Sequence, residues 1–186
     1  MGKIILHENI TPEGYCDHRA FIADIELMKS VNDLLGTANM VLFGRNTFQL
    51  FESYWPSVWQ TKNAPDPDIE FARLMENIEK VVFSKTIQGS SCQNTKVIPH
   101  LDQRVIKSLK EMYEHNIIVF GSLNLATQLI RSGMVDEYYF IVQPIIFGSG
   151  GRLFNEVDHD KRYDLKLLDT NIYSSGAVSI HYQCSQ

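Results

Sequence analysis

Three turns in the sequence carry the residue types that bind phosphate groups, and each directly follows an apolar run. Glycine lets the backbone approach an anion closely, while Arg, Lys, Ser and Thr supply hydrogen-bond donors. A helix that begins directly after such a turn adds its free backbone N–H groups. The candidate residues are Gly44, Arg45, Asn46 and Thr47 in the first turn, Ser84 and Lys85 in the second, and Gly121, Ser122, Leu123 and Asn124 in the third.

Taken singly, each turn could equally be an ordinary connection that carries a surface cation. The three turns together are more specific, because ligands of open α/β sheets bind beyond the carboxyl ends of the parallel strands. They predict one extended ligand that carries several phosphate groups. The sequence contains no G-x-G-x-x-G, so a Rossmann dinucleotide fingerprint is excluded.

A carboxylate at the first predicted helix is the acid–base candidate. Asp24 lies three and four residues before Leu27 and Met28, a spacing that predicts a place on the inward, apolar face of that helix. Glu26 instead shares the polar side of the helix. A carboxylate on a buried face must find donors or shift its pKa upward, which is how functional carboxylates arise. The alternative is that Asp24 satisfies backbone N–H groups where the helix begins.

The composition argues against several other sites and partners. There are 186 residues with 17 Lys and Arg against 22 Asp and Glu, a net charge of −5, so nothing favours nucleic acid or an anionic membrane. The six histidines show no metal-ligand spacing, and no apolar run is long enough for a transmembrane helix. Cys16, Cys92 and Cys184 are scattered and odd in number, which suits reduced thiols in the cytoplasm.

The elements that must position these residues alternate along residues 1–133. Short apolar runs typical of buried strands are separated by segments with a helical apolar period, which predicts a largely parallel sheet. Later strands at 135–143, 163–170 and 177–183 predict an antiparallel end, the last two forming a hairpin. We therefore predict one α/β domain over residues 1–186, with a mixed, mostly parallel sheet. Residues 56–65 are expected to form a loop.

Five stretches of the sequence match the motifs of one superfamily. They are residues 42–48, 84–86, 120–125, 129–137 and 144–150. On these stretches the chain resembles the dihydrofolate reductase superfamily, in particular stand-alone relatives of the C-terminal reductase domain of the bifunctional riboflavin deaminase–reductase. The resemblance covers nearly the whole chain. It implies a dihydrofolate-reductase-like three-layer fold, with helices on both faces of the sheet.

The resemblance also implies roles for the candidate residues. NADPH would lie across the carboxyl ends of the parallel strands, with its pyrophosphate at turns 44–47 and 121–124 and its adenosine side at 44–47. Ser84 and Lys85 would lie near the 2′-phosphate, and residues 10–15 would form a mobile loop beside the nicotinamide. Asp24 would take the position of the acid that binds the pterin, as the catalytic residue. The expected substrate-binding residues are Leu27, Met28 and Trp55.

The function implied is reduction of a pteridine or a pyrimidine, such as 5-amino-6-(5-phosphoribosylamino)uracil, by NADPH in the cytoplasm. The sequence has no H-x-E…P-C-x-x-C zinc motif, so the chain is not expected to deaminate. The apolar edge of the C-terminal strands, together with the resemblance, implies a homodimer. Two alternatives remain: a module that binds NADPH without turnover, and a flavodoxin-like protein that binds another phosphorylated ligand.

Overall fold

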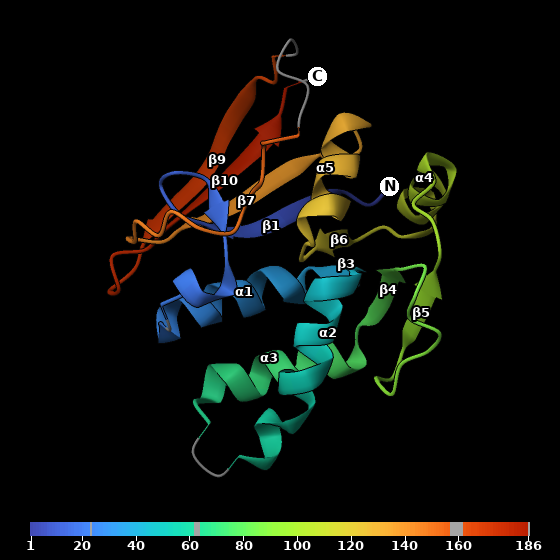
Figure 1. Cartoon of the computed structure of the whole chain (residues 1–186), viewed down its shortest axis with the longest axis horizontal. Helices are drawn as coiled ribbons and strands as arrows, with labels where there is room; N and C mark the ends of the chain where they lie inside the picture. The colour runs from blue at the N-terminus through green and yellow to red at the C-terminus, as the bar shows by residue number, and fades with distance from the viewer. Residues whose placement is uncertain (23, 62–63, 157–161, 186) are drawn as a thin grey trace.

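A single eight-stranded sheet runs through the computed structural model, which describes residues 1–22, 24–61, 64–156 and 162–185 (Figure 1). Its strand order is β5-β4-β3-β6-β1-β7-β10-β9. The strands are β1 (Ile4–Ile10), β3 (Ala38–Gly44), β4 (Glu79–Phe83), β5 (Thr95–Ile98), β6 (Asn116–Val119), β7 (Glu137–Val142), β9 (Leu165–Ile172) and β10 (Val178–Cys184). The short strands β2 (Tyr15–Cys16) and β8 (Gly151–Arg152) pair with each other beside it.

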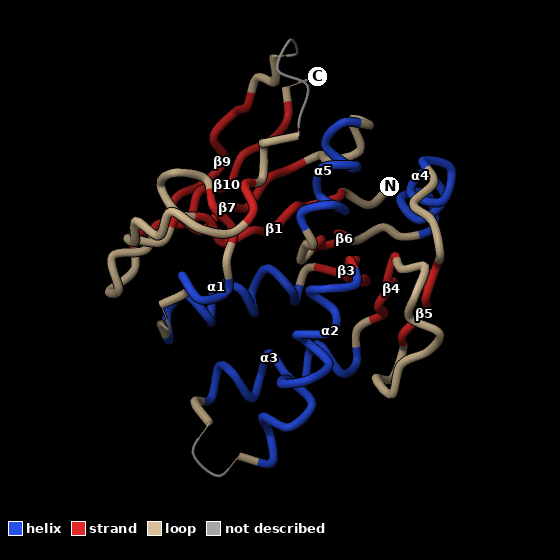
Figure 2. Tube along the Cα trace, viewed as in Figure 1, coloured by secondary structure: helices blue, strands red, loops and turns tan. Residues whose placement is uncertain are grey.

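Helices cover both faces of the sheet, as Figure 2 shows in blue. The helices are α1 (Ile25–Gly36), α2 (Arg45–Tyr54), α3 (Asp66–Asn77), α4 (Gln103–Met112) and α5 (Leu123–Arg131), with 3-10 turns η1 (His18–Ala20) and η2 (Trp55–Gln60). Apolar residues of α1, α2 and α3 form one core cluster, and those of α4 and α5 form the other. Strand β1 serves both, because Ile4 and Leu6 face one cluster and Ile5 the other. The predicted three-layer fold is confirmed.

The strand directions agree with the sequence prediction. β3, β4, β5, β6, β1 and β7 pair in parallel, so their carboxyl ends share one edge of the sheet. β10 is antiparallel to both β7 and β9, which confirms the C-terminal hairpin. The prediction of a loop over 56–65 is wrong in part, since η2 continues the chain to Gln60 directly after α2. Among the described helices, none is long and apolar enough to cross a membrane.

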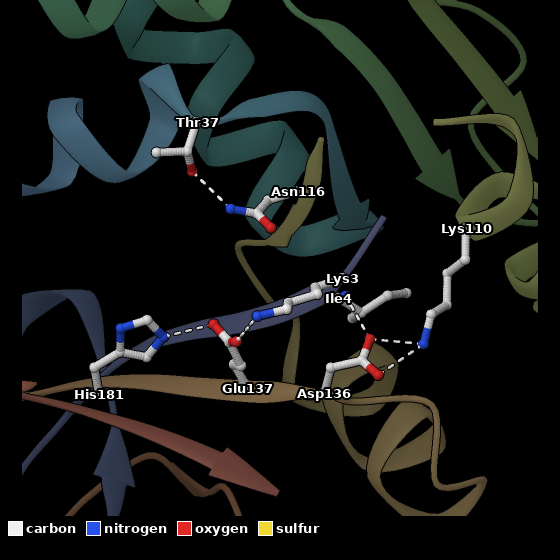
Figure 3. A network of polar contacts seen from close by, with 8 residues as sticks. All are labelled: Lys3, Ile4, Thr37, Lys110, Asn116, Asp136, Glu137 and His181. Atoms are coloured by element: carbon white, nitrogen blue, oxygen red, sulfur yellow. Dashed lines mark hydrogen bonds and ion pairs between the residues drawn. The ribbon is translucent and has the colours of Figure 1, made fainter. Parts of the chain in front are cut away.

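The amino ends of β1 and β7 carry a network of paired charges (Figure 3). The carboxylate of Glu137 lies 2.7 Å from Lys3 Nζ and 2.8 Å from His181 Nε2. Asp136 accepts a hydrogen bond from Ile4 N at 2.7 Å and pairs with Lys110 Nζ at 2.6 Å. The hydrogen bond from His181 is the largest cause that lowers the pKa of Glu137, although burial opposes it. These contacts join the amino end of β1 to β7, β10 and α4, so the network has a structural role.

Candidate functional site

A cavity of about 670 Å³ opens at the carboxyl ends of β3, β4 and β6. It lies between the starts of α2 and α5 and the segments that follow β4 and β5. Seven of the ten predicted cofactor residues line it: Gly44, Arg45, Asn46, Ser84, Lys85, Ser122 and Asn124. The structure thus brings three turns together that are far apart in the sequence.

Two helices begin at this cavity without a side-chain cap. Gly44 and Ser122 are the N-cap residues of α2 and α5, and neither makes a side-chain hydrogen bond to its helix. By contrast, Asp24 and Asp102 cap α1 and α4 with their carboxylates. The first backbone N–H groups of α2 and α5 therefore have no capping side chain, and the helix dipoles place partial positive charge at this edge.

The starts of α2 and α5 lie against each other. Gly44 N donates a hydrogen bond to Gly121 O at 2.8 Å, which joins the two turns. In Figure 1, both helices start beside the ends of β3 and β6. A Cβ atom at Gly44 would lie 2.9 Å from Ser122 N, closer than side chains approach a backbone atom. Gly121 has a φ of +71°, a conformation that L side chains rarely adopt. Both glycines are therefore required for this close approach.

Cations and hydroxyl groups surround the two helix starts. Arg45 is exposed and donates weakly to Thr86 Oγ1 at 3.4 Å, which links the first turn to the second. Lys85 is also exposed. Ser84 is buried, and its Oγ accepts from the backbone N of Thr86 at 3.2 Å, so its hydroxyl group shapes the turn. This combination of helix N-termini and cations suits an anion.

The other three predicted cofactor residues, Thr47, Gly121 and Leu123, are not among the residues that line the cavity. Thr47 Oγ1 faces Gly121, because a Cβ atom on Gly121 would lie 3.1 Å from it. Leu123 directs its side chain away from the cavity, toward Gly151 and the core cluster of α5.

Residues 10–15, the predicted loop beside the nicotinamide, are held in part by Glu13. Its Oε1 accepts hydrogen bonds from Phe147 N and Gly148 N.

The structure corrects the predicted position of Asp24. Helix α1 begins at Ile25, so Asp24 precedes the first turn and has no place on the apolar face of the helix. Its carboxylate accepts hydrogen bonds from the backbone N of Glu26 and Leu27, and from Ser174 Oγ and Ser175 N at 3.2 and 2.9 Å. These bonds, above all that of Ser175, lower its pKa to about 2. A catalytic role for Asp24 stays a prediction, whereas its contacts are those of a helix cap.

The predicted substrate residues belong to the core cluster of α1, α2 and α3. Leu27 is fully buried there, while Met28 and Trp55 pack against it from partly exposed positions. The ring of Trp55 lies 4.4 Å from that of Phe71, centroid to centroid. None of the three lines the 670 Å³ cavity. Their contact with a substrate stays a prediction.

Two polar residues on β1 were missed by the sequence analysis. His7 Nε2 and Glu8 Oε1 are buried, and neither has a hydrogen-bond partner among the described residues. Burial lowers the pKa of His7 to about 4 and raises that of Glu8 to about 8. His7 lies between the rings of Phe120 and Tyr139. The signal was available, because three polar residues, His7, Glu8 and Asn9, interrupt the apolar strand.

Metal ligands do not gather among the described residues, where no group of three or more His, Cys, Asp or Glu side chains is placed to hold an ion. At the cavity, the uncapped helix N-termini, the cations and the hydroxyl groups suit binding of an anion.

The fold is that of a dihydrofolate-reductase-like α/β protein. A pyrimidine reductase-like protein from Corynebacterium diphtheriae superposes with a TM-score of 0.69, at 13% identity, covering 100% of this chain and 92% of that one. Dihydrofolate reductase from Enterococcus faecalis, in complex with NADP(H) and RAB-propyl, gives 0.66 at 14% identity and covers 100% and 98% of the two chains.

Sequence comparison gives the family. Residues 8–179 match the RibD C-terminal domain, and the chain belongs to that family. The uncharacterized protein YyaP of Bacillus subtilis is 30% identical over 183 residues, which cover 97% of this chain and 94% of that protein. The family is one of reductase domains, so a reductase is the class of enzyme that the chain's membership supports.

Proposed function

We propose that this chain is an NADPH-dependent reductase of a pteridine or a pyrimidine, of the 5-amino-6-(5-phosphoribosylamino)uracil reductase kind. The observation that carries the proposal is the pair of uncapped helix N-termini that meet at one cavity beside Arg45 and Lys85. A ligand with two separate anionic groups matches this arrangement. NADPH has a pyrophosphate and a 2′-phosphate, and it supplies the hydride when bound.

The residues present fit this cofactor. The backbone N–H groups that begin α2 and α5 suit the pyrophosphate, since the hydrogen bond from Gly44 N to Gly121 O holds the two turns together. Arg45, the first residue of α2, and Lys85, which follows β4, both line the cavity and suit the 2′-phosphate. A volume of about 670 Å³ is within the range of cofactor pockets.

The substrate class rests on the family and on the aromatic side of the molecule. Tyr139 is buried in the core cluster of α1, α2 and α3, and Phe120 and Trp55 pack against that cluster from partly exposed positions. A flat heterocycle suits such surroundings, because aromatic rings stack on planar ligands. Support for a pterin or pyrimidine comes from the family and from the named activities of the structural neighbours.

The test has two stages. Binding is measured first: NADPH is titrated into the protein while the intrinsic fluorescence of the protein is recorded. Flavin mononucleotide is tested as the competing ligand. Oxidation of NADPH is then followed against a panel of dihydropterins and ribosylaminouracils. We expect NADPH to bind, flavin mononucleotide not to bind, and one member of the panel to be reduced. Binding with no turnover on any member would favour the NADPH-binding module instead.

The assembly proposed is a homodimer through the C-terminal strands. β9 is the edge strand of the sheet, and Leu165, Leu167, Leu168 and Ile172 on it are exposed. An apolar edge strand with unpaired backbone groups needs cover, and a second copy supplies a matching one. Light scattering at micromolar concentration checks this, and a monomer there would refute it.

The compartment proposed is the cytoplasm. The three cysteines are free in the structure, which is the state that a reducing compartment maintains. Localisation of a tagged full-length chain tests this directly.

A further inference from the structure

Glu8 is a carboxyl group that the fold has buried without a partner. Oε1 is shielded from solvent and makes no hydrogen bond to any described residue, although the residue as a whole is partly exposed. Leaving a buried polar atom unsatisfied is unfavourable, because the atom loses its hydrogen bonds to water. A residue kept at that cost on a central strand, where Ile4 and Leu6 fill the same face, calls for an explanation.

The surroundings of Glu8 point to the cofactor cleft. A Cβ atom on Gly121 would lie 3.1 Å from Glu8 Oε1 and 3.1 Å from Thr47 Oγ1. Gly121 accepts the hydrogen bond from Gly44 and directly precedes the N-cap of α5. The carboxyl group therefore lies beside Gly121, next to the junction at which both uncapped helices begin. Because Gly121 has no side chain, the space in front of Oε1 is left unfilled by its Cβ.

No cation among the described residues compensates a charge on Glu8. Burial is the cause that raises the pKa of its carboxyl group to about 8. The Cys16 thiol on β2 is the titratable group that interacts with it, and both burial and the charge of Glu8 raise the pKa of that thiol, so it stays neutral. His7 faces the opposite side of the sheet, and Phe140 is the pairing partner on β7. At neutral pH, Glu8 is therefore mostly a neutral acid with one hydrogen to donate.

We propose that Glu8 is a ligand-binding residue beside this cleft, which donates its carboxyl hydrogen to an acceptor oxygen of a dinucleotide bound where the turns of Gly44 and Ser122 meet. The proposal rests on the proposed function, because the ligand is taken to be NADPH. The proton has two effects. It provides a donor, and it removes the negative charge that would otherwise repel the phosphate groups across a site of low dielectric.

A proton that is needed for binding makes the affinity depend on pH. If NADPH binds the protonated form, binding raises the pKa of Glu8 further above 8, and the complex takes up protons. The affinity is then constant well below that pKa. It falls by up to about tenfold for each pH unit above it.

The experiment measures the dissociation constant of NADPH for the full chain from about pH 7 to about pH 9.5, where the 2′-phosphate stays fully ionised. We expect the wild-type affinity to fall by roughly tenfold or more over that range. Glu8→Gln keeps the shape and an N–H donor but cannot ionise, so its affinity stays nearly constant. Glu26→Gln, an exposed carboxylate on α1, is the matched control and keeps the wild-type profile.

A second measurement needs no variant. Calorimetric titration of the wild-type protein with NADPH near pH 8.5, in buffers of different ionisation enthalpy, counts the protons taken up. An uptake approaching one proton supports the proposal. Binding without uptake, an affinity that rises with pH, or equal profiles for wild type and Glu8→Gln would overturn it while leaving the proposed function intact. Failure of NADPH to bind at any pH would instead refute the proposed function.

Discussion

The two ends of the parallel strands treat their polar groups in opposite ways. At the amino ends, Glu137 and Asp136 each have partners within 3 Å, and the network joins four elements of the fold. At the carboxyl ends, two helices begin without caps and Glu8 Oε1 has no partner among the described residues. The difference indicates where a ligand would bind. The carboxylates at the amino ends have hydrogen-bond partners within the fold, whereas the helix N-termini and Glu8 Oε1 at the carboxyl ends have donors or acceptors that a ligand could satisfy.

Two glutamates make this comparison sharp. Hydrogen bonds from His181 and Lys3 lower the pKa of Glu137, whereas burial alone raises that of Glu8 to about 8. Their chemistry is the same, and only the partners differ. Glu137 is thus a structural anion, whereas Glu8 is a carboxyl group whose Oε1 has no hydrogen-bond partner among the described residues.

The largest expected effect is on stability, at the amino ends. Glu137→Ala removes the shared partner of Lys3 and His181, and we expect the free energy of unfolding to fall by roughly 2–4 kcal/mol. That is below the usual figure for a fully buried pair, since Lys3 is half exposed. Urea denaturation measures the loss. NADPH affinity of the folded fraction should not change, and a parallel loss of binding would show that the two ends are not independent.

The next effect is on cofactor affinity, at the carboxyl ends. Arg45→Ala removes a charged donor from the cavity, so NADPH should bind about 10–150 times more weakly, a loss of about 1.5–3 kcal/mol. Fluorescence titration measures it, with Arg73→Ala on α3 as the exposed control. If the contact is to the 2′-phosphate, NADH affinity should fall less. Equal losses would assign Arg45 to the pyrophosphate, and no loss would remove Arg45 from the site.

A glycine substitution tests the close approach of the two helix starts. Gly44→Ala adds a Cβ atom 2.9 Å from Ser122 N, so the turns must separate at a cost of about 1–3 kcal/mol. We expect a lower melting temperature together with at least about fivefold weaker NADPH binding. Gly36→Ala is the matched control, because a Cβ atom there meets nothing within 4 Å. Unchanged NADPH affinity in Gly44→Ala would separate this junction from the site.

The smallest effect concerns Asp24, a satisfied carboxylate outside the network at the amino ends. Asp24→Asn weakens a cap and should cost about 1 kcal/mol of stability at neutral pH. Since folding lowers the pKa of Asp24 to about 2, its contribution is present above about pH 4 and is lost as the pH falls through 2. The variant should lack that acid dependence in thermal melts. A tenfold or larger fall in kcat/KM at unchanged stability would instead support the predicted catalytic role.

Local patterns were enough to predict that three turns meet at one edge. Gly44 ends a buried strand, Ser84 and Ser122 come after two others, and parallel strands bring such ends together, so the meeting of the turns followed from the alternation of elements. The pattern of strands after residue 134 likewise predicted the C-terminal hairpin. These features depend on short stretches of sequence and on general rules of chain connection.

The remaining features depend on contacts that no local pattern contains. Asp24 was assigned to a helix face because its spacing was correct, but a shift of one residue in the helix start turns it into a cap. Its bond to Ser175 joins residues 151 positions apart. Glu8 Oε1 lies next to Gly121, which is 113 positions further along the chain, and its own strand cannot show that neighbour or the missing partner.

The central place of β1 has a consequence for synthesis of the chain. Ile5 pairs with Ile118 on β6 and with Glu137 on β7, so β1 leaves the ribosome before both strands that enclose it in the sheet. Strands β3 and β4 can pair with each other before β6 and β7 have been synthesised. Until then β1 has neither of its neighbouring strands, and its apolar side chains are exposed. We expect the nascent chain to depend on chaperone cover until β7 emerges, and truncations before that point to aggregate rather than fold.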